Sequence, residues 1–275
     1  MPKKSNEPSR RYHDRVARRY DAIYDDPFWE FHDCITWNHL KHFVPREPAA
    51  AVLDLGCGTG KWGLRLLKMG FAVTFVDHSQ NMLEEVQAKL ERWKQQSDLS
   101  AKAARGAVLA ADALDLGALP PEHFALVVGM GDVVSICGDA GKCLSELRRV
   151  LKPGAVAVFT VDNALAAIDH FVDKGDLDAL DAFAKTGRTA WLTQDKSEQF
   201  PLQMFTPETT RKLVRNAGLE WDSMIGKTII PARLNKKLFE SERALVRLIE
   251  MEETLARDPA AAARASHLQV AARRP

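Results

Sequence analysis

The fold is decided by the stretch Val52-Leu53-Asp54-Leu55-Gly56-Cys57-Gly58-Thr59-Gly60. A short apolar run ends at Leu55, three glycines follow, and a helical segment begins at Lys61. Glycine tolerates positive φ and lets a ligand approach the main chain, and the first N–H groups of a helix have no partner within it. The stretch therefore predicts a buried strand followed by a turn that binds a nucleotide-like ligand.

On both sides of this turn the pattern predicts an α/β fold. Short apolar runs alternate with helical segments, which is typical of a parallel sheet built from strand-helix-strand units. We predict a doubly wound, mostly parallel seven-stranded sheet of the Rossmann-like type. The expected strands are 51–55, 72–76, 107–111, 124–129, 155–161, 219–230 and 267–272, and the expected helices of the core are 61–68, 81–94, 140–150 and 207–216.

The rest of the chain is predicted to add a cap and two insertions to one domain. Apolar Val16, Tyr20, Ile23 and Tyr24 are spaced for one face of an N-terminal helix, and a second helix is expected over 28–43. The insertions are predicted to hold a helix over 164–186, a strand over 189–192 and a long helix over about 235–257. The expected boundaries are 1–47 for a polar leader and helical cap, 48–275 for the main domain, and about 163–205 and 231–262 for lid insertions within it.

The charge balance disfavours a dedicated nucleic-acid binder. The chain has 275 residues, with 38 Lys and Arg against 37 Asp and Glu, and a net charge of +1. Such a balance supplies no overall field for a polyanion. Seven basic and two acidic residues fall within 1–19, so a basic leader precedes a mildly acidic body. We interpret that leader as a solvated segment.

Cysteine usage and hydropathy indicate an intracellular setting. Cys34, Cys57, Cys137 and Cys143 form no C-x-x-C pair, which predicts neither a zinc site nor a disulfide framework. No apolar run is long enough to span a membrane, and no secretory signal is recognised. We expect a cytoplasmic protein. The sequence carries no signal of its oligomeric state.

The glycine turn fits two kinds of ligand, and Asp54 discriminates between them. Gly58, Gly60 and Gly63 satisfy the G-x-G-x-x-G pattern of dinucleotide binding. A carboxylate within the turn would repel a pyrophosphate but suits a cationic amino group. A phosphate-binding P-loop is disfavoured as well, because Trp62 stands where a Ser or Thr would hold magnesium. We therefore favour a ligand that carries an amino acid moiety.

The motifs resemble the class I S-adenosylmethionine-dependent methyltransferase family, in particular its small-molecule type. The resemblance rests on D-L-G-C-G-T-G at 54–60, Asp77 after the second strand, Ala111-Asp112-Ala113 after the third, and 147–154 before the fifth. It implies S-adenosyl-L-methionine as the cofactor and methyl transfer by in-line displacement to a small-molecule acceptor. The acceptor atom (O, N, S or C) is left open.

The resemblance also implies which residues bind the cofactor. Asp54 and the backbone of Gly56 and Gly58 are expected to hold the methionine part, while Asp77 offers its carboxylate to the ribose hydroxyls. Asp112 is expected to accept from the adenine amino group. Further positions assigned to the cofactor are Ala113, whose N–H faces the ring, His78 and Met82, which pack on the adenine or ribose, and Cys57, Gly60, Gly129 and Tyr20.

The sequence gives weaker evidence for the residues that act on the methyl acceptor. Asp132 follows the fourth strand, where members of the family often place a residue near the transferred methyl group, and it is the preferred catalytic candidate. Tyr20 is the second, because its hydroxyl is expected to reach the cofactor as the helix closes over the site. His32 and His170 are weighed as general bases, although a lone histidine is more often structural.

Metal dependence and two competing functions are weighed beside methyl transfer. Catechol-type enzymes bind magnesium through an Asp after the fourth strand and an Asp-Asn pair after the fifth, and Asp132 and Asp162-Asn163 stand at similar places. The N-terminal helix and the insertions look unlike that type, so no metal is expected. The competing functions are an NAD(P)-dependent oxidoreductase that uses the Gly58, Gly60 and Gly63 turn, and a non-catalytic cofactor-binding subunit of the same fold.

Overall fold

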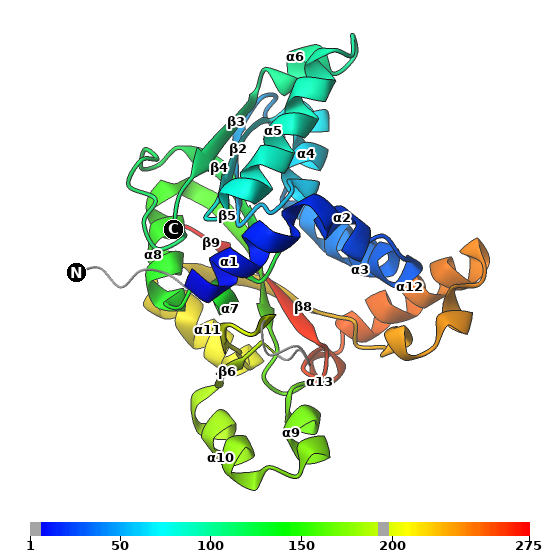
Figure 1. Ribbon diagram of the computed structural model, residues 1–275. Coiled ribbons are helices and arrows are strands. Elements are labelled where there is room, and N and C mark those ends of the chain that lie inside the picture. Colours follow the sequence, from blue (N-terminus) through cyan, green and yellow to red (C-terminus); the bar gives the residue numbers. More distant parts are fainter. Residues whose placement is uncertain (1–6, 192–197) are drawn as a thin grey trace.

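The computed structural model of the chain (Figure 1) describes residues 7–191 and 198–275. A seven-stranded sheet forms its centre, in the order β3-β2-β1-β4-β5-β9-β8, and confirms the predicted doubly wound α/β architecture. The strands are β1 (Ala51–Leu55), β2 (Ala72–Asp77), β3 (Gly106–Ala110), β4 (Phe124–Gly129), β5 (Leu151–Asp162), β8 (Glu220–Lys227) and β9 (His267–Arg273).

Strand direction places the ligand-binding edge of the sheet. Strands β3, β2, β1, β4 and β5 are parallel, whereas β9 pairs antiparallel with both β5 and β8. The order reverses between β1 and β4, and ligands of open α/β sheets bind outside the carboxyl ends of the strands at such a switch point. The antiparallel β9 brings its own first residues to that same edge.

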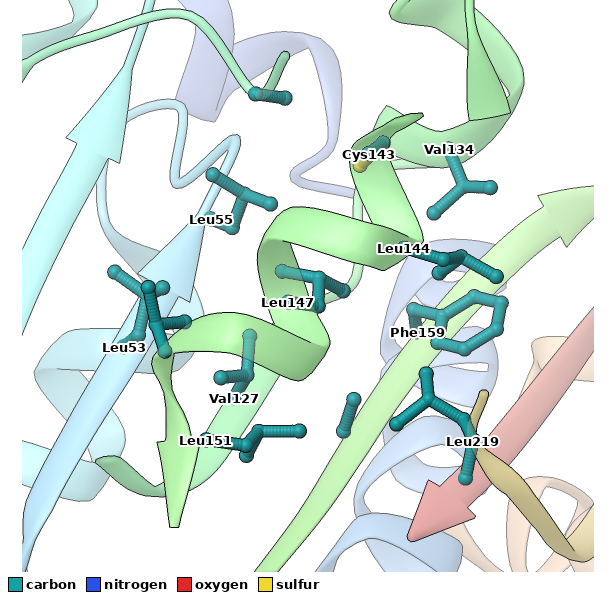
Figure 2. Close-up of a cluster of buried hydrophobic side chains, with 14 of the residues drawn as sticks. Leu53, Leu55, Val127, Val134, Cys143, Leu144, Leu147, Leu151, Phe159 and Leu219 are labelled. Atoms are coloured by element: carbon teal, nitrogen blue, oxygen red, sulfur yellow. The ribbon is translucent and has the colours of Figure 1, made fainter. Parts of the chain in front are cut away.

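Helices cover both faces of the sheet and bury its apolar side chains. One face packs against α8 (Ala140–Val150) and α11 (Pro207–Asn216). Leu144 and Leu147 of α8 lie with Leu53 and Phe159 of the sheet in one cluster (Figure 2), to which Val214 of α11 also belongs. The other face packs against α4 (Lys61–Lys68), α5 (Gln80–Lys94) and the end of α3 (Pro27–Leu40). Strands buried on both faces explain the nearly continuous apolar runs of the sequence.

The N-terminal segment is more broken than the sequence predicted. It comprises α1 (Glu7–Val16), a 3₁₀ helix (Ala17–Arg19), α2 (Tyr20–Ile23) and α3, followed by a second 3₁₀ helix (Lys41–Phe43). Helix α3 starts at Pro27 because the Asp26 side chain accepts from the N–H groups of Phe28 and Trp29, and proline suits the first helical position.

The segment 163–205 holds two helices where one was expected. Gly175, with φ +65°, ends α9 (Ile168–Lys174), and Asp176 caps α10 (Leu177–Thr186), so the single helix predicted over 164–186 is wrong. A small hairpin follows, made of β6 (Arg188–Ala190) and β7 (Pro201–Gln203). The predicted strand ends at Leu192, which lies outside the described residues.

The segment 231–262 packs beside the N-terminal helices. It contains two 3₁₀ helices (Ala232–Leu234 and Lys236–Phe239), α12 (Glu242–Ala256) and α13 (Pro259–Ala262), so the long helix predicted from 235 begins later, at the Ser241 cap. Leu248 of α12 is buried with Phe31 and Ile35 of α3. Short helices α6 (Ser100–Ala103) and α7 (Val133–Ile136) complete the fold. Within the described ranges, none of the helices has the length and apolar character needed to span a membrane.

Gly63 is expected to be required by packing. A Cβ there would come within 2.6 Å of Asp54 Oδ2 and closer still to the Phe75 ring, so helix α4 can lie against β1 and β2 only without a side chain. We predict that Gly63→Ala lowers the free energy of unfolding by about 1–3 kcal/mol, measured by urea denaturation.

The matched control for Gly63→Ala is Gly141→Ala in α8. A Cβ at Gly141 meets nothing nearer than Asp139 Oδ1 at 3.5 Å. This control is expected to raise the free energy of unfolding by about 0.5–1 kcal/mol, because alanine is the better helix former. Equal effects of the two substitutions would contradict the packing argument.

Candidate functional site

The glycine turn after β1 has the backbone conformation that its sequence predicts. Gly56, Gly58 and Gly60 adopt φ values of +62°, +52° and +87°, which favour glycine over residues with a Cβ. A Cβ at Gly56 would also lie 2.9 Å from the Cβ of Val133, so this residue is required by space as well as by conformation. The turn exposes main-chain atoms at the carboxyl end of β1.

Asp77, the last residue of β2, organises the neighbouring loops. Its Oδ2 accepts from Gly58 N at 2.9 Å, and its Oδ1 accepts from Ser79 N at 2.8 Å. The Ser79 hydroxyl in turn accepts from Met82 N and caps α5. The carboxylate thus holds the glycine turn and the start of α5 in one arrangement.

A cavity opens directly beside these residues, at the carboxyl ends of four parallel strands. Its empty volume is about 500 Å³, part of it open to solvent. The wall contributed by the sheet includes the predicted residues Gly56, Asp77, His78, Asp112 and Ala113. The remaining lining residues are Leu55, Val76, Ala111, Gly131, Val133, Ile136, Cys137 and, from α1, Ser9 and His13.

Helix α1 therefore forms one wall of this cavity, through Ser9 and His13. The sequence did not predict a cavity-lining role for either residue. The His13 Nδ1 lies 2.8 Å from the carbonyl oxygen of Ser9, and burial lowers the pKa of His13, so its ring is neutral near pH 7. Its ring centroid lies 6.0 Å from that of His78. A histidine in an amphipathic helix gives no local signal that distinguishes a cavity-lining position from a structural one.

Two aspartates fasten the N-terminal segment to the core. Asp14 Oδ1 accepts from the Ser79 hydroxyl at 2.6 Å, and the Asp14 carbonyl accepts from Asn81 Nδ2 at 2.8 Å. Asp21 accepts from the Thr59 hydroxyl and pairs with Lys89 at 2.7 Å. Both contacts link the segment to the loops that follow β1 and β2.

Asp54 lies behind the cavity, not in its lining. The side chain is buried and its Oδ2 accepts from Gly63 N at 2.8 Å. Burial, together with the nearby Asp77 charge, raises the pKa of Asp54 to about 7. A cation bound at the glycine turn would favour the charged form of this carboxyl group.

Other predicted cofactor residues also lie outside the cavity lining. Met82 is fully buried in a cluster with Val16 and Phe200. Tyr20 packs over the glycine turn, because a Cβ at Gly58 would lie 3.7 Å from its ring. The lining likewise does not include Cys57, Gly58, Gly60 or Gly129.

The catalytic candidate Asp132 lies between Gly131 and Val133, which both line the cavity. It adopts φ +53°, an uncommon conformation for a residue with a side chain. Its Oδ2 lies 3.7 Å from His267 Nε2, and that same nitrogen lies 3.8 Å from Asp162 Oδ1. The structure thus brings Asp132 together with Asp162 and with a histidine that sequence reasoning missed.

Buried basic side chains adjoin this group. Lys227 Nζ donates to His32 Nε2 at 3.1 Å and to the Thr36 hydroxyl at 3.2 Å. Burial lowers the pKa of Lys227 to about 8, against the attraction of Asp132. Burial and the lysine charge together lower the pKa of His32 to about 3. The His32 ring is therefore neutral, and its Nε2 accepts the hydrogen bond from Lys227.

Asn163 does not join the group that includes Asp132 and Asp162. Its Nδ2 donates to the carbonyl oxygens of Ala263 and Ala265, and its Oδ1 accepts from Leu165 N. The Asp-Asn pattern of catechol-type enzymes is therefore matched in sequence but not in side-chain placement. His170, the other histidine considered, lies on α9 and does not line the cavity.

Comparisons with known proteins agree with this architecture. A family model described as a methyltransferase domain matches residues 52–154. A ubiquinone/menaquinone biosynthesis C-methyltransferase from Acidiphilium cryptum is 30% identical over 216 residues, which cover 75% of this chain and 80% of that relative. A demethylmenaquinone methyltransferase from Leptospira interrogans is 32% identical over 147 residues, which cover 52% of this chain and 55% of the relative.

A solved structure gives the same result for the fold. An S-adenosylmethionine-dependent methyltransferase from Methanosarcina mazei superposes with a TM-score of 0.60 at 18% identity, covering 86% of this chain and 96% of that one. The chain spans 32% to 55% of the length of the first curated relatives it matches.

The docking of α1 is predicted to depend on Asp14. In Asp14→Ala the contacts of its carboxylate with Ser79 and Asn81 are lost, so trypsin should cleave after Arg15, Arg18 or Arg19 several-fold faster than in the wild type. Limited proteolysis followed by mass spectrometry measures this rate. The matched control is Asp25→Ala, an exposed carboxylate outside this contact, for which an unchanged rate is expected. Equal cleavage of both variants would contradict the assigned contact.

Proposed function

The chain belongs to the class I S-adenosylmethionine-dependent methyltransferase family, and on that premise we propose that it transfers a methyl group from S-adenosylmethionine to a small aromatic acceptor that carries a hydroxyl group. The cofactor follows from the family. The acceptor class is the part that the proposal adds.

The composition of the cavity carries the proposal. Asp77 and Asp112 contribute carboxylates, and no lysine or arginine lines the cavity within 7–191 and 198–275. A pyrophosphate would meet two negative groups and no cation, which disfavours an NAD(P)-dependent oxidoreductase. A ligand with hydroxyl groups, a purine and a positive charge suits the same surroundings.

This chain's own residues would hold the cofactor in a defined order along the strand ends. The main chain of the glycine turn, supported by Asp54, faces the amino acid part, Asp77 accepts from the ribose hydroxyls, and Asp112 with Ala113 N–H faces the purine. When bound, the cofactor supplies a methyl group on a positively charged sulfur that leaves readily. The protein's share of the reaction is therefore to align the acceptor, exclude water and remove a proton.

A row of aromatic rings supports an aromatic acceptor. Tyr20, which covers the glycine turn, lies 4.8 Å from Tyr24, and Tyr24 lies 4.6 Å from Trp29, measured between ring centroids. Trp29 in turn lies 5.2 Å from His32. Such faces favour planar ligands by stacking. Of the two relatives described above, one is named for demethylmenaquinone and the other for ubiquinone/menaquinone biosynthesis, and a quinone that is reduced becomes a hydroxylated aromatic ring.

The first test separates the cofactor classes. S-adenosylhomocysteine at a hundredfold over its Kd should stabilise the protein by about 2.7 kcal/mol and raise Tm by about 5 °C, whereas NAD should leave Tm unchanged. Asp77→Asn is predicted to weaken S-adenosylhomocysteine about tenfold, measured by calorimetry, because a charge-assisted hydrogen bond is lost. Asp98→Asn, at an exposed position, serves as the matched control and should bind as the wild type does.

The second test addresses methyl transfer. Labelled S-adenosylmethionine is incubated with the quinol obtained by reducing demethylmenaquinone, and the organic extract is analysed for labelled product. Binding of S-adenosylhomocysteine without any labelled product would support a non-catalytic cofactor-binding subunit. A shift of Tm by NAD alone would overturn the proposal.

Cofactor affinity is predicted to fall below pH 7. The pKa of Asp54 is raised to about 7 in the free protein, and a bound ammonium group favours the ionised carboxylate. Binding should therefore release a proton, and the Kd of S-adenosylhomocysteine should rise up to tenfold per pH unit below 7. Calorimetry in two buffers of different ionisation enthalpy counts this proton. In Asp54→Asn this pH dependence should be lost, and its persistence would assign it to another group.

A further inference from the structure

His267 occupies a position that only the antiparallel strand β9 creates. As the first residue of β9, it pairs with Asp162 at the end of β5 and with Lys227 at the end of β8. The carboxyl ends of those two strands and the start of β9 thus meet at one edge of the sheet. Asp132, which follows β4, approaches the same point from the other side.

The His267 imidazole lies among titratable side chains from several elements. Its Nε2 lies 3.7 Å from Asp132 Oδ2 and 3.8 Å from Asp162 Oδ1. The positive charge of Lys227 in β8 also acts on the imidazole. The ring centroid of His267 lies 6.0 Å from that of His32 in α3. Within the described part of the chain, the buried atoms His267 Nδ1 and Asp132 Oδ1 have no hydrogen-bond partner. These two atoms therefore take no part in the hydrogen bonds of the described fold.

The geometry points to His267 as the general base of the reaction: we propose that its Nε2 takes the hydroxyl proton of the methyl acceptor, with Asp132 stabilising the imidazolium that forms. The inference rests on the proposed function and adds a residue that contacts the reacting group.

Location and access fit this role. Asp132 is flanked by Gly131 and Val133 of the cavity wall, so the cluster adjoins the cavity. The side chains of His267, Asp132 and Asp162 remain 24%, 22% and 18% exposed, which leaves them reachable by a small molecule. His32 is unsuited to the role, because its Nε2 already accepts from Lys227.

The charge state fits as well. Burial lowers the pKa of His267, and the Lys227 charge lowers it further, while Asp132 opposes this shift. The resting ring is therefore neutral near pH 7 and can accept a proton. Burial and repulsion by Asp132 raise the pKa of Asp162 well above its usual range. This raised pKa disfavours a negative charge on Asp162, so Asp132 is the group that attracts the positive charge arising on His267.

The step balances without any further reactant. The acceptor's O–H bond breaks, its proton moves to His267 Nε2, and the electron pair stays on the acceptor. That pair forms the new bond to the methyl carbon, at the oxygen or through the ring at a neighbouring carbon, while the pair of the broken S–CH₃ bond stays on sulfur. At a ring carbon, the ring proton is lost afterwards and the oxygen regains one, so one proton is released in either case.

The test compares the wild type with His267→Gln at pH 4.5–9, using labelled S-adenosylmethionine and reduced demethylmenaquinone. In the wild type, kcat should rise tenfold per pH unit below the pKa of His267 and then level off. In His267→Gln we expect kcat to fall about 10²–10⁴-fold and the acid limb to disappear, with the affinity for S-adenosylhomocysteine within twofold of the wild type. His170→Gln is the matched control and should behave as the wild type does.

A second variant keeps the test decisive if His267→Gln is unstable. Asp132→Asn removes the charge that raises the pKa of His267, so the acid limb of kcat should move to lower pH. The proposal is overturned if His267→Gln retains both kcat and the acid limb. It is also overturned if the wild type loses activity in EDTA and recovers it in Mg²⁺, because the cluster of Asp132, Asp162 and His267 would then be a metal site. A wild type that binds S-adenosylhomocysteine but methylates no quinol overturns the proposed function, and with it the role of His267.

Discussion

The arrangement of the site depends on one carboxylate, that of Asp77, and its two hydrogen bonds to Gly58 N and Ser79 N. The first fixes the glycine turn at the end of β1, and the second fixes the start of α5. The Ser79 hydroxyl also donates to Asp14 of α1. By fixing Ser79, the Asp77 carboxylate therefore also influences the position of α1. A carboxylate tied to two main-chain donors is held in place before any ligand arrives, so it would need little further ordering to accept from a ligand in the cavity.

The sequence predicted the parallel part of this structure well because its signals are local. Asp77 and Asp112 directly follow apolar runs, Asp132 follows one shortly after its end, and strand ends of a parallel sheet share an edge. The prediction of one helix over 164–186 was wrong because Gly175 adopts the αL conformation and ends α9, although the helical pattern of the sequence continues past it. His267 and His13 were missed because only tertiary pairing brings them to the site. His267 lies more than a hundred residues from Asp132, and β9 carries no motif that marks its first residue.

The cavity and the neighbouring group of Asp132, Asp162, His267 and Lys227 differ in the charges that they carry. This difference follows from the direction of the strands. Parallel strands end in acidic loops around the cavity, with no lysine or arginine in its lining among the described residues. Beyond Asp132, strands β8 and β9 add Lys227 and His267 to the same edge. The buried lysine offsets the carboxylates that gather there, at the cost of its own desolvation. A near-neutral chain thus contains neighbouring regions of distinct charge.

The position of α1 has a consequence for the shape of the cavity. Ser9 and His13 form part of the cavity wall, and Asp14 and Asp21 bind the loops that follow β2 and β1. A displacement of this segment would therefore remove part of the wall and expose the ends of the strands to solvent. Substitutions in either loop would in this way change the cavity without altering any residue that lines it.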